Sequence, residues 1–137
     1  WNMERSWGVE PQPFEAALDR EMRDLIGRPG FYAKSGSFLS RGFYAQQLER
    51  LFALFPREQV LVLRSDWLRN DPARTIGRVL AFLEVGPMGP TEGIEAHVRS
   101  YPEPLDPGTR AKLAGFFEPE IRRLEALLGW DLSDWRR

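Results

Sequence analysis

Few side chains in this sequence are of the types that carry out covalent catalysis. The chain has no Cys and a single His, His97. Without Cys there is no disulfide scaffold, thiolate metal site or cysteine nucleophile. One His cannot by itself complete a zinc-protease motif or a serine–histidine triad. We therefore expect no metal site, and any chemistry here must proceed without a thiol.

A long loop rich in Pro and Gly, from Gly86 to Gly108, carries two groups that suit an anion. Arg99 can hold a phosphate through two N–H groups of its planar guanidinium. His97 can be partly charged near neutral pH. Loops of about twenty residues are usually functional or disordered. Solvated loop side chains are the alternative for both residues, and both interpretations stay open.

A second group of candidates surrounds the turn Ser40-Arg41-Gly42-Phe43-Tyr44. Ser40 and Tyr44 could line a substrate pocket, and Gly42 would let another group approach the backbone closely. The alternative is a helix start with Tyr44 in the core. Asp66 follows an apolar run, where ligands gather in open α/β sheets, but a turn or capping carboxylate is the favoured explanation.

Composition limits the class of protein further. The chain has 137 residues, with 19 Lys and Arg against 20 Asp and Glu, for a net charge of −1. This length suits one domain. The balance of charges argues against a domain-wide basic surface for nucleic acid, and no apolar stretch approaches a membrane span. We expect a cytoplasmic protein.

Periodicity predicts the elements that must position these side chains. Apolar residues recur at helical spacing from Phe14 to Ile26 and from Phe38 to Phe55. The run from Gln59 to Arg64 has no alternation, which predicts a buried strand of a parallel sheet.

The second half of the chain predicts two more helical stretches. Asp71 and Pro72 are typical of a helix start, as cap and first residue. The final stretch runs from Pro107 to Leu128, where Pro119 predicts a break and Gly129 a C-cap. We expect Trp130, Leu132 and Trp135 to pack the tail against the core. One strand cannot form a sheet, so either the fold is mostly helical or its other strands precede Trp1.

The order of motifs resembles the C-terminal half of the PAPS-dependent sulfotransferases, both the bacterial members and the carbohydrate (heparan sulfate) type. PAPS is 3′-phosphoadenosine-5′-phosphosulfate. The resemblance covers nearly the whole chain. It is carried by Ser40–Leu51, Phe55–Leu63, Asp66, Leu68, Asp71-Pro72, Val79–Leu83, Tyr101-Pro102, Thr109-Arg110, Leu113, Phe116-Phe117, Pro119, Leu124, Leu127–Gly129 and Trp135.

The resemblance implies an α/β fold, namely the C-terminal part of a three-layer, P-loop-like domain that is mostly helical in this chain with one or few parallel strands. It implies that residues 1–137 form a single partial domain. The Gly-rich donor loop, the Arg–Ser pair for the 3′-phosphate and the catalytic base would belong to an N-terminal half, and Trp1 would lie within a helix of the larger fold.

The resemblance also implies site residues. Carbohydrate sulfotransferases close a Lys-Gly-Arg-x-Tyr-Pro stretch over the donor phosphates, and His97-Val98-Arg99-Ser100-Tyr101-Pro102 lies at that place. Arg99 and Tyr101 match the pattern, while His97 and Val98 replace its Lys and Gly. These four residues are the predicted donor contacts, and Ser40 and Tyr44 the predicted acceptor contacts.

The implied activity is transfer of a sulfonate group from PAPS to a hydroxyl or amine of a small-molecule or carbohydrate acceptor. Two alternatives remain at this stage. One is a non-catalytic helical interaction module that retains the scaffold. The other is another P-loop-type transferase such as a nucleotide kinase, although the chain shows no Walker loop.

Overall fold

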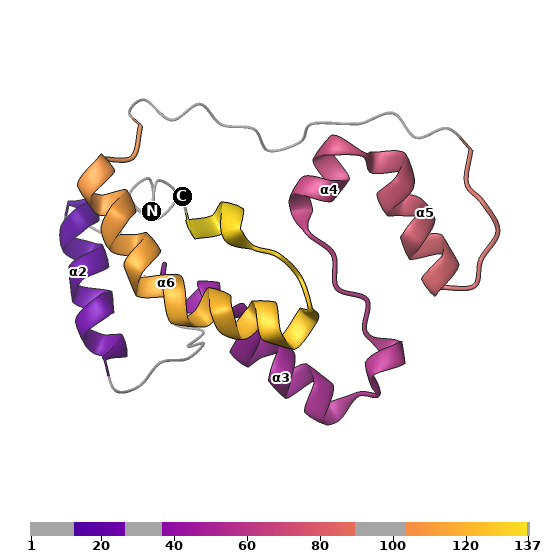
Figure 1. Cartoon of the computed structure of the whole chain (residues 1–137), viewed down its shortest axis with the longest axis horizontal. Helices are drawn as coiled ribbons and strands as arrows, with labels where there is room; N and C mark the ends of the chain where they lie inside the picture. The colour runs from indigo at the N-terminus through magenta and orange to yellow at the C-terminus, as the bar shows by residue number, and fades with distance from the viewer. Residues whose placement is uncertain (1–12, 27–36, 90–103, 137) are drawn as a thin grey trace. The chain divides into compact units, whose positions relative to one another are not determined.

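The structure, a computed structural model, describes residues 13–26, 37–89 and 104–136. The chain divides into two compact units. The first comprises residues 1–53 and 104–137, and the second comprises residues 54–103. The described parts of both units are helical (Figure 1). The prediction of a mostly helical chain is therefore confirmed, whereas the single partial domain stays a prediction.

Helix α6 organises the first unit. It spans Pro107–Leu128, and its apolar side chains enter two clusters. The first cluster joins it to α2, Phe14–Leu25, and to the segment before α3. The second joins it to α3, Tyr44–Leu54, and to the C-terminal tail. Phe117 packs against both clusters and so connects the two halves of this core.

The C-terminal tail packs as expected from its apolar residues. Leu132 is fully buried in the second cluster, and Trp130 packs against that cluster. The short 3-10 helix η3, Ser133–Arg136, follows. The tail returns beside α6 in Figure 1. The left-handed residue that ends α6 is Gly129, at φ 66°, so the predicted C-cap is confirmed.

Two α-helices lie in the described part of the second unit. Helix α4, Ser65–Asn70, precedes α5, Pro72–Phe82. The predicted start of α5 is confirmed, because the Asp71 side chain accepts a hydrogen bond from the Arg74 N–H at 3.0 Å and Pro72 occupies the first helical position. The guanidinium carbon of Arg78 lies 5.0 Å from the centre of the Trp67 ring.

The predicted strand at Gln59–Arg64 is wrong for the described residues, none of which form a strand. Arg57–Gln59 is the 3-10 helix η2, and Val60 and Arg64 have extended backbone angles without a ladder. Leu61 is 36% exposed, so the run is not buried either. A strand needs a partner for its backbone groups, and the described part of the chain supplies none.

Two helix boundaries also differ from expectation. The helix predicted from Phe38 begins at Tyr44, after the 3-10 helix η1, Ser40–Gly42. The predicted break at Pro119 is absent, since α6 continues through it. Both sides of Pro119 are anchored, by Phe116 and Phe117 in the first cluster and by Ile121 in the second, so tertiary packing offsets the lost hydrogen bond.

Candidate functional site

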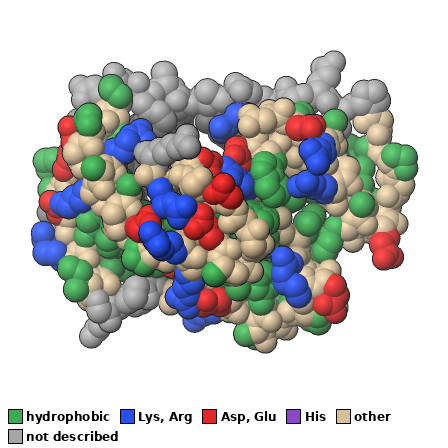
Figure 2. All heavy atoms as spheres, in the orientation of Figure 1, with side chains coloured by type: hydrophobic (Ala, Val, Ile, Leu, Met, Phe, Trp, Pro, Cys, Tyr) green, Lys and Arg blue, Asp and Glu red, His purple; other side chains and the backbone are tan. Residues whose placement is uncertain are grey.

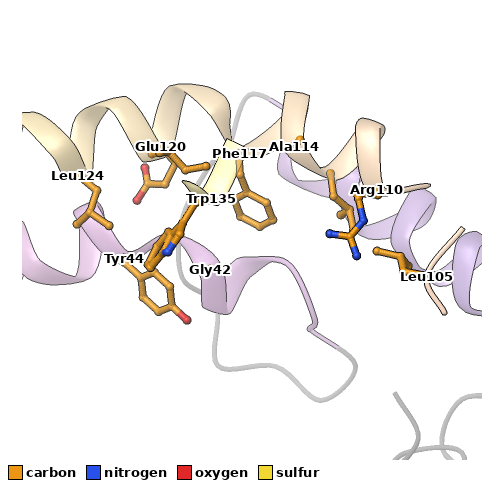
Figure 3. Close-up of a pocket in the computed structure, with 11 residues that line it drawn as sticks. Gly42, Tyr44, Leu105, Arg110, Ala114, Phe117, Glu120, Leu124 and Trp135 are labelled. Carbon is orange, nitrogen blue, oxygen red and sulfur yellow. The ribbon is translucent and has the colours of Figure 1, made fainter. Parts of the chain in front are cut away.

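A cavity of about 330 Å³ lies in the first unit, between the start of α3 and one side of α6 (Figure 3). Most of its wall is apolar. Two side chains of the acidic and basic types line it, Arg110 and Glu120, both on α6. The full lining is Gly42, Tyr44, Leu105, Arg110, Leu113, Ala114, Phe117, Glu120, Ile121, Leu124 and Trp135.

Aromatic rings from three elements meet at this cavity. Tyr44 on α3 and Trp135 on η3 stand at 63° to each other with ring centroids 6.1 Å apart, and Figure 3 shows them side by side. Tyr44 is 49% exposed, so it is accessible to a ligand rather than enclosed in the core. Phe117 points from α6 toward Gly42. Such rings offer an apolar contact surface with a polar hydroxyl at its edge.

The segment that leads to Tyr44 is held by carboxylates from distant helices. Glu21 of α2 accepts hydrogen bonds from the N–H groups of Phe38, Leu39 and Ser40 at 2.6, 2.9 and 2.9 Å. Glu120 of α6 accepts from the N–H groups of Ala45 and Gln46 at 2.7 and 3.3 Å. Both glutamates are buried, with 8% of each exposed.

The predicted acceptor contacts occupy different environments. Tyr44 lines the cavity, whereas Ser40 is 1% exposed and its N–H is bound to Glu21. The close approach expected at Gly42 is made by the Phe117 ring, because a Cβ on Gly42 would lie 2.8 Å from ring carbons. The structure thus places Tyr44 and Gly42 together at one cavity. Ser40 is buried and does not line that cavity.

The predicted donor contacts His97, Val98, Arg99 and Tyr101 lie outside the described residues. Asp66 is described, and its carboxylate accepts from the Arg64 Nε and Nη2 at 2.9 and 2.6 Å and from the Trp67 N–H at 3.0 Å. The hydrogen bond from Arg64 lowers the pKa of Asp66. Arg64 is the N-cap residue of α4, and Asp66 and Trp67 lie in its first turn, so these contacts are local to the start of that helix.

The Glu125 carboxylate binds the C-terminal tail that carries Trp135. Glu125 of α6 accepts from the Arg136 Nη1 at 2.7 Å and from the Leu132 N–H at 2.9 Å. The Arg136 hydrogen bond lowers the pKa of Glu125, and the same contact raises the pKa of Arg136. Both groups stay charged near neutral pH, so the tail remains tied to α6 there.

Charges on the surface of the first unit are mixed in sign. Lys112 pairs with Asp19 between α6 and α2, and Arg123 pairs with Glu49 between α6 and α3. On the face in Figure 2, blue and red side chains are interspersed over these helices. Within residues 13–26, 37–89 and 104–136 no group of three or more acidic or His side chains could hold a metal ion.

Sequence reasoning missed Glu21 and Glu120, although a signal existed. Each glutamate lies at an apolar position of its helix, three residues after Leu18 and Phe117 respectively. A charged residue on the buried stripe of an amphipathic helix needs a buried partner. That exception to the pattern predicts a buried carboxylate, but not which backbone groups it binds.

Comparison with known proteins finds distant relatives of one kind. The chain is 29% identical, over 122 residues, to bifunctional heparan sulfate N-deacetylase/N-sulfotransferase 4 of Mus musculus. The type 3 enzymes of Mus musculus and Homo sapiens match with the same identity. Each match covers 70% of this chain. The chain spans only 14% of the length of these relatives. A sulfotransferase relationship is thereby suggested.

Other comparisons add no identification. No protein-family model matches the chain, and no solved structure matches it significantly. None of the described helices is both long enough and apolar enough to span a membrane.

Proposed function

We propose that this chain forms the C-terminal part of a sulfotransferase that moves a sulfonate group from PAPS to a hydroxyl or amine of an acceptor. One observation carries the proposal: 70% of the chain aligns with three relatives that are all named as N-sulfotransferases. The relatives act on heparan sulfate by name, so a carbohydrate acceptor is the first choice for this protein.

The described cavity suits an acceptor better than the donor. PAPS carries several anionic groups, and its binding requires several cationic or backbone N–H partners. The cavity wall offers one guanidinium, that of Arg110, among mainly apolar side chains. Tyr44 and Trp135 at this wall could instead pack against the face of an acceptor.

Donor contacts are assigned to the loop that contains Arg99. Sulfonate transfer needs positioning and stabilisation of negative charge more than covalent help from the protein. In this proposal the Arg99 guanidinium binds donor phosphates together with backbone N–H groups, His97 adds partial positive charge, and Val98 and Tyr101 shape the loop. Tyr44 faces the acceptor, with Ser40 supporting it.

Titration with 3′-phosphoadenosine-5′-phosphate tests the proposal. This nucleotide is what remains of PAPS after the sulfonate group has been transferred. The protein used should be the complete natural polypeptide that carries this sequence. We expect saturable binding by calorimetry, weakened about 10- to 100-fold by Arg99→Ala because a charged hydrogen-bonding partner is lost. Arg69→Ala, at the exposed end of α4, is the matched control and should leave the Kd unchanged.

The alternatives give different outcomes in the same experiment. An interaction module would bind no nucleotide, and a nucleotide kinase would bind ATP with Mg²⁺ in preference to the 3′-phosphorylated nucleotide. One observation favours the module: Ile76, Leu80, Val85 and Met88 line an apolar groove of about 460 Å³ beside α5. Absence of binding to the complete polypeptide would reject the sulfotransferase proposal.

A further inference from the structure

Two buried carboxylates bind the two ends of one short stretch of backbone. Glu21 binds three consecutive N–H groups, those of residues 38–40, and Glu120 binds the N–H groups of residues 45 and 46. The residues between these two sets are 41–44. The segment that ends at the cavity is therefore attached on one flank to α2 and on the other to α6.

The start of α3 explains why an outside carboxylate is needed. The first N–H groups of a helix have no partner within the helix and are usually bound by a Ser, Thr, Asp or Asn at the N-cap. Phe43 occupies that place here, since its carbonyl accepts the first α3 hydrogen bond from the Gln47 N–H. A phenyl ring accepts no such bond, and Glu120 performs the capping from α6 instead.

Burial of these glutamates is costly unless their oxygens are satisfied. Both oxygens of Glu21 and the Oε1 of Glu120 accept from backbone N–H groups, which cannot move without moving the segment. Between the two attached stretches, Gly42 lies close to Cε1 and Cζ of the Phe117 ring. Figure 3 shows the Glu120 carboxylate directed from α6 toward the start of α3, where Tyr44 begins.

We infer that Glu21 and Glu120 are positioning residues that fix the Ser40–Tyr44 segment, and thereby fix the Tyr44 ring against Trp135 at the cavity. The inference rests on the proposed function only where it assigns Tyr44 to the acceptor. Glu120 also lines the cavity and Glu21 does not, but the role inferred for both is to bind backbone N–H groups. Their role is to set the angle at which Tyr44 enters the cavity wall.

Glu120 binds its donors through one oxygen, whereas Glu21 uses both. This difference predicts different effects of a Gln substitution at the two positions. Glu120 uses one oxygen, Oε1, for both of its donors. Glu21 uses Oε2 for Phe38 and Leu39 and Oε1 for Ser40. A Gln at position 120 can offer its carbonyl oxygen to both donors. A Gln at position 21 must direct its NH₂ group at one N–H donor, so it cannot replace Glu21.

Amide hydrogen exchange, measured by NMR on the full chain, tests the clamp, by which we mean the hydrogen bonds from Glu21 and Glu120 to the backbone of residues 38–40 and 45–46. Glu120→Ala should accelerate exchange at Ala45 and Gln46 by about 10- to 100-fold, the effect of losing a hydrogen bond to a charged acceptor. Glu120→Gln should restore slow exchange. Glu21→Gln should instead accelerate exchange within residues 38–40. Exchange at Leu124 monitors global unfolding in every variant.

Matched controls come from the same helices. Glu118→Gln changes the charge two residues from Glu120, but Glu118 pairs with Arg122 and Arg136 rather than with α3. Asp24→Asn changes an exposed carboxylate on α2. Neither control should alter exchange at residues 38–46. Unchanged exchange at Ala45 in Glu120→Ala, or no rescue by Glu120→Gln, would overturn the inference.

A second readout follows the Tyr44 ring itself. The chain has three Tyr residues, so 3-fluorotyrosine labelling gives three ¹⁹F signals, and Tyr44→Phe assigns one of them. Glu120→Ala should shift the Tyr44 signal and Glu120→Gln should leave it in place. A Tyr44 signal that is the same in Glu120→Ala and the parent protein would contradict the positioning role.

Nucleotide binding separates this inference from the proposed function. The Kd for 3′-phosphoadenosine-5′-phosphate should be unchanged in Glu120→Ala, because the clamp acts on the acceptor side. A loss as large as that of Arg99→Ala would overturn the acceptor-side assignment of Tyr44. If the parent protein binds no nucleotide, the proposed function fails, while the exchange and ¹⁹F results still decide whether the clamp exists.

Discussion

At the scale of single residues, the position of Gly42 leaves no room for a larger side chain. A Cβ on Gly42 would lie 2.8 Å from Cε1 and Cζ of Phe117. Phe117 packs in both apolar clusters and cannot move aside freely. We therefore expect Gly42→Ala to lower the free energy of unfolding by about 1–3 kcal/mol, the usual cost of overpacking. Urea unfolding measures this change.

The matched control for Gly42 is Gly115, an exposed residue inside α6. A Cβ on Gly115 would meet nothing within 4 Å. Gly115→Ala should raise the free energy of unfolding by about 0.5–1 kcal/mol, because Ala favours the helix. Equal effects of the two substitutions would show that the approach of Phe117 to Gly42 is not tight.

Glu125 predicts a dependence of stability on pH. Its pKa is lowered from an ordinary value of 4.5 by the hydrogen bond from Arg136. A lowered pKa in the folded state means that the ion pair stabilises the fold above pH 4.5 and that this contribution is lost as the pH falls through the lowered pKa. Glu125→Gln should therefore lower the Tm at pH 7, by an amount that decreases as the pH falls below 4.5.

Thermal unfolding at several pH values tests this prediction, with Glu58→Gln as the control. Glu58 is an exposed carboxylate on η2, in the second unit. If the Tm difference between Glu125→Gln and the parent protein does not decrease at any pH below 4.5 at which the protein still folds, the ion pair with Arg136 does not contribute as described.

At the scale of elements, local signals predicted most of the helices. The bounds predicted for α6, Pro107 and Leu128 with Gly129 as C-cap, match the structure, which adds Asp106 as the N-cap that accepts from the Thr109 N–H at 2.8 Å. Capping and the left-handed C-cap depend on adjacent residues only. They can therefore be predicted without knowledge of the fold.

Features that depend on distant residues could not be predicted in this way. The run from Gln59 to Arg64 has the composition of a buried strand, but a strand forms only beside a partner. The delayed start of α3 depends on Glu21 and Glu120, which are 19 and 75 positions away from the residues that they bind, Ser40 and Ala45. The sequence indicated Tyr44 as a candidate site residue. The glutamates that hold its segment could be identified only from the three-dimensional structure.

Pro119 offers a test of how packing overrides helix propensity. Proline inside a helix removes a hydrogen bond to the carbonyl four residues earlier, here Gly115, and crowds that carbonyl. Because α6 is continuous nevertheless, Pro119→Ala should raise the free energy of unfolding by about 1–3 kcal/mol. Pro107→Ala is the control at the first helical position, where the missing N–H costs little. A destabilised Pro119→Ala would mean that the ring itself makes a needed contact.

At the scale of the whole molecule, the two units differ in how much apolar surface they bury. All the buried apolar side chains of the described residues belong to the first unit. In the described part of the second unit only Thr75 is buried, and Leu83, Val85 and Met88 are more than half exposed. Local stability follows the density of buried apolar contacts. The second unit should therefore open more readily than the first.

Hydrogen exchange of the 137-residue chain measures this difference. Amides in the middle of α5 should exchange at least about tenfold faster than those in the middle of α6, which corresponds to a difference of about 1.4 kcal/mol in opening free energy. Comparable protection in α5 and α6 would show that the apolar side of α5, with Ile76 and Leu80, is covered in solution. The groove beside α5 would then be part of the folded core rather than an open surface.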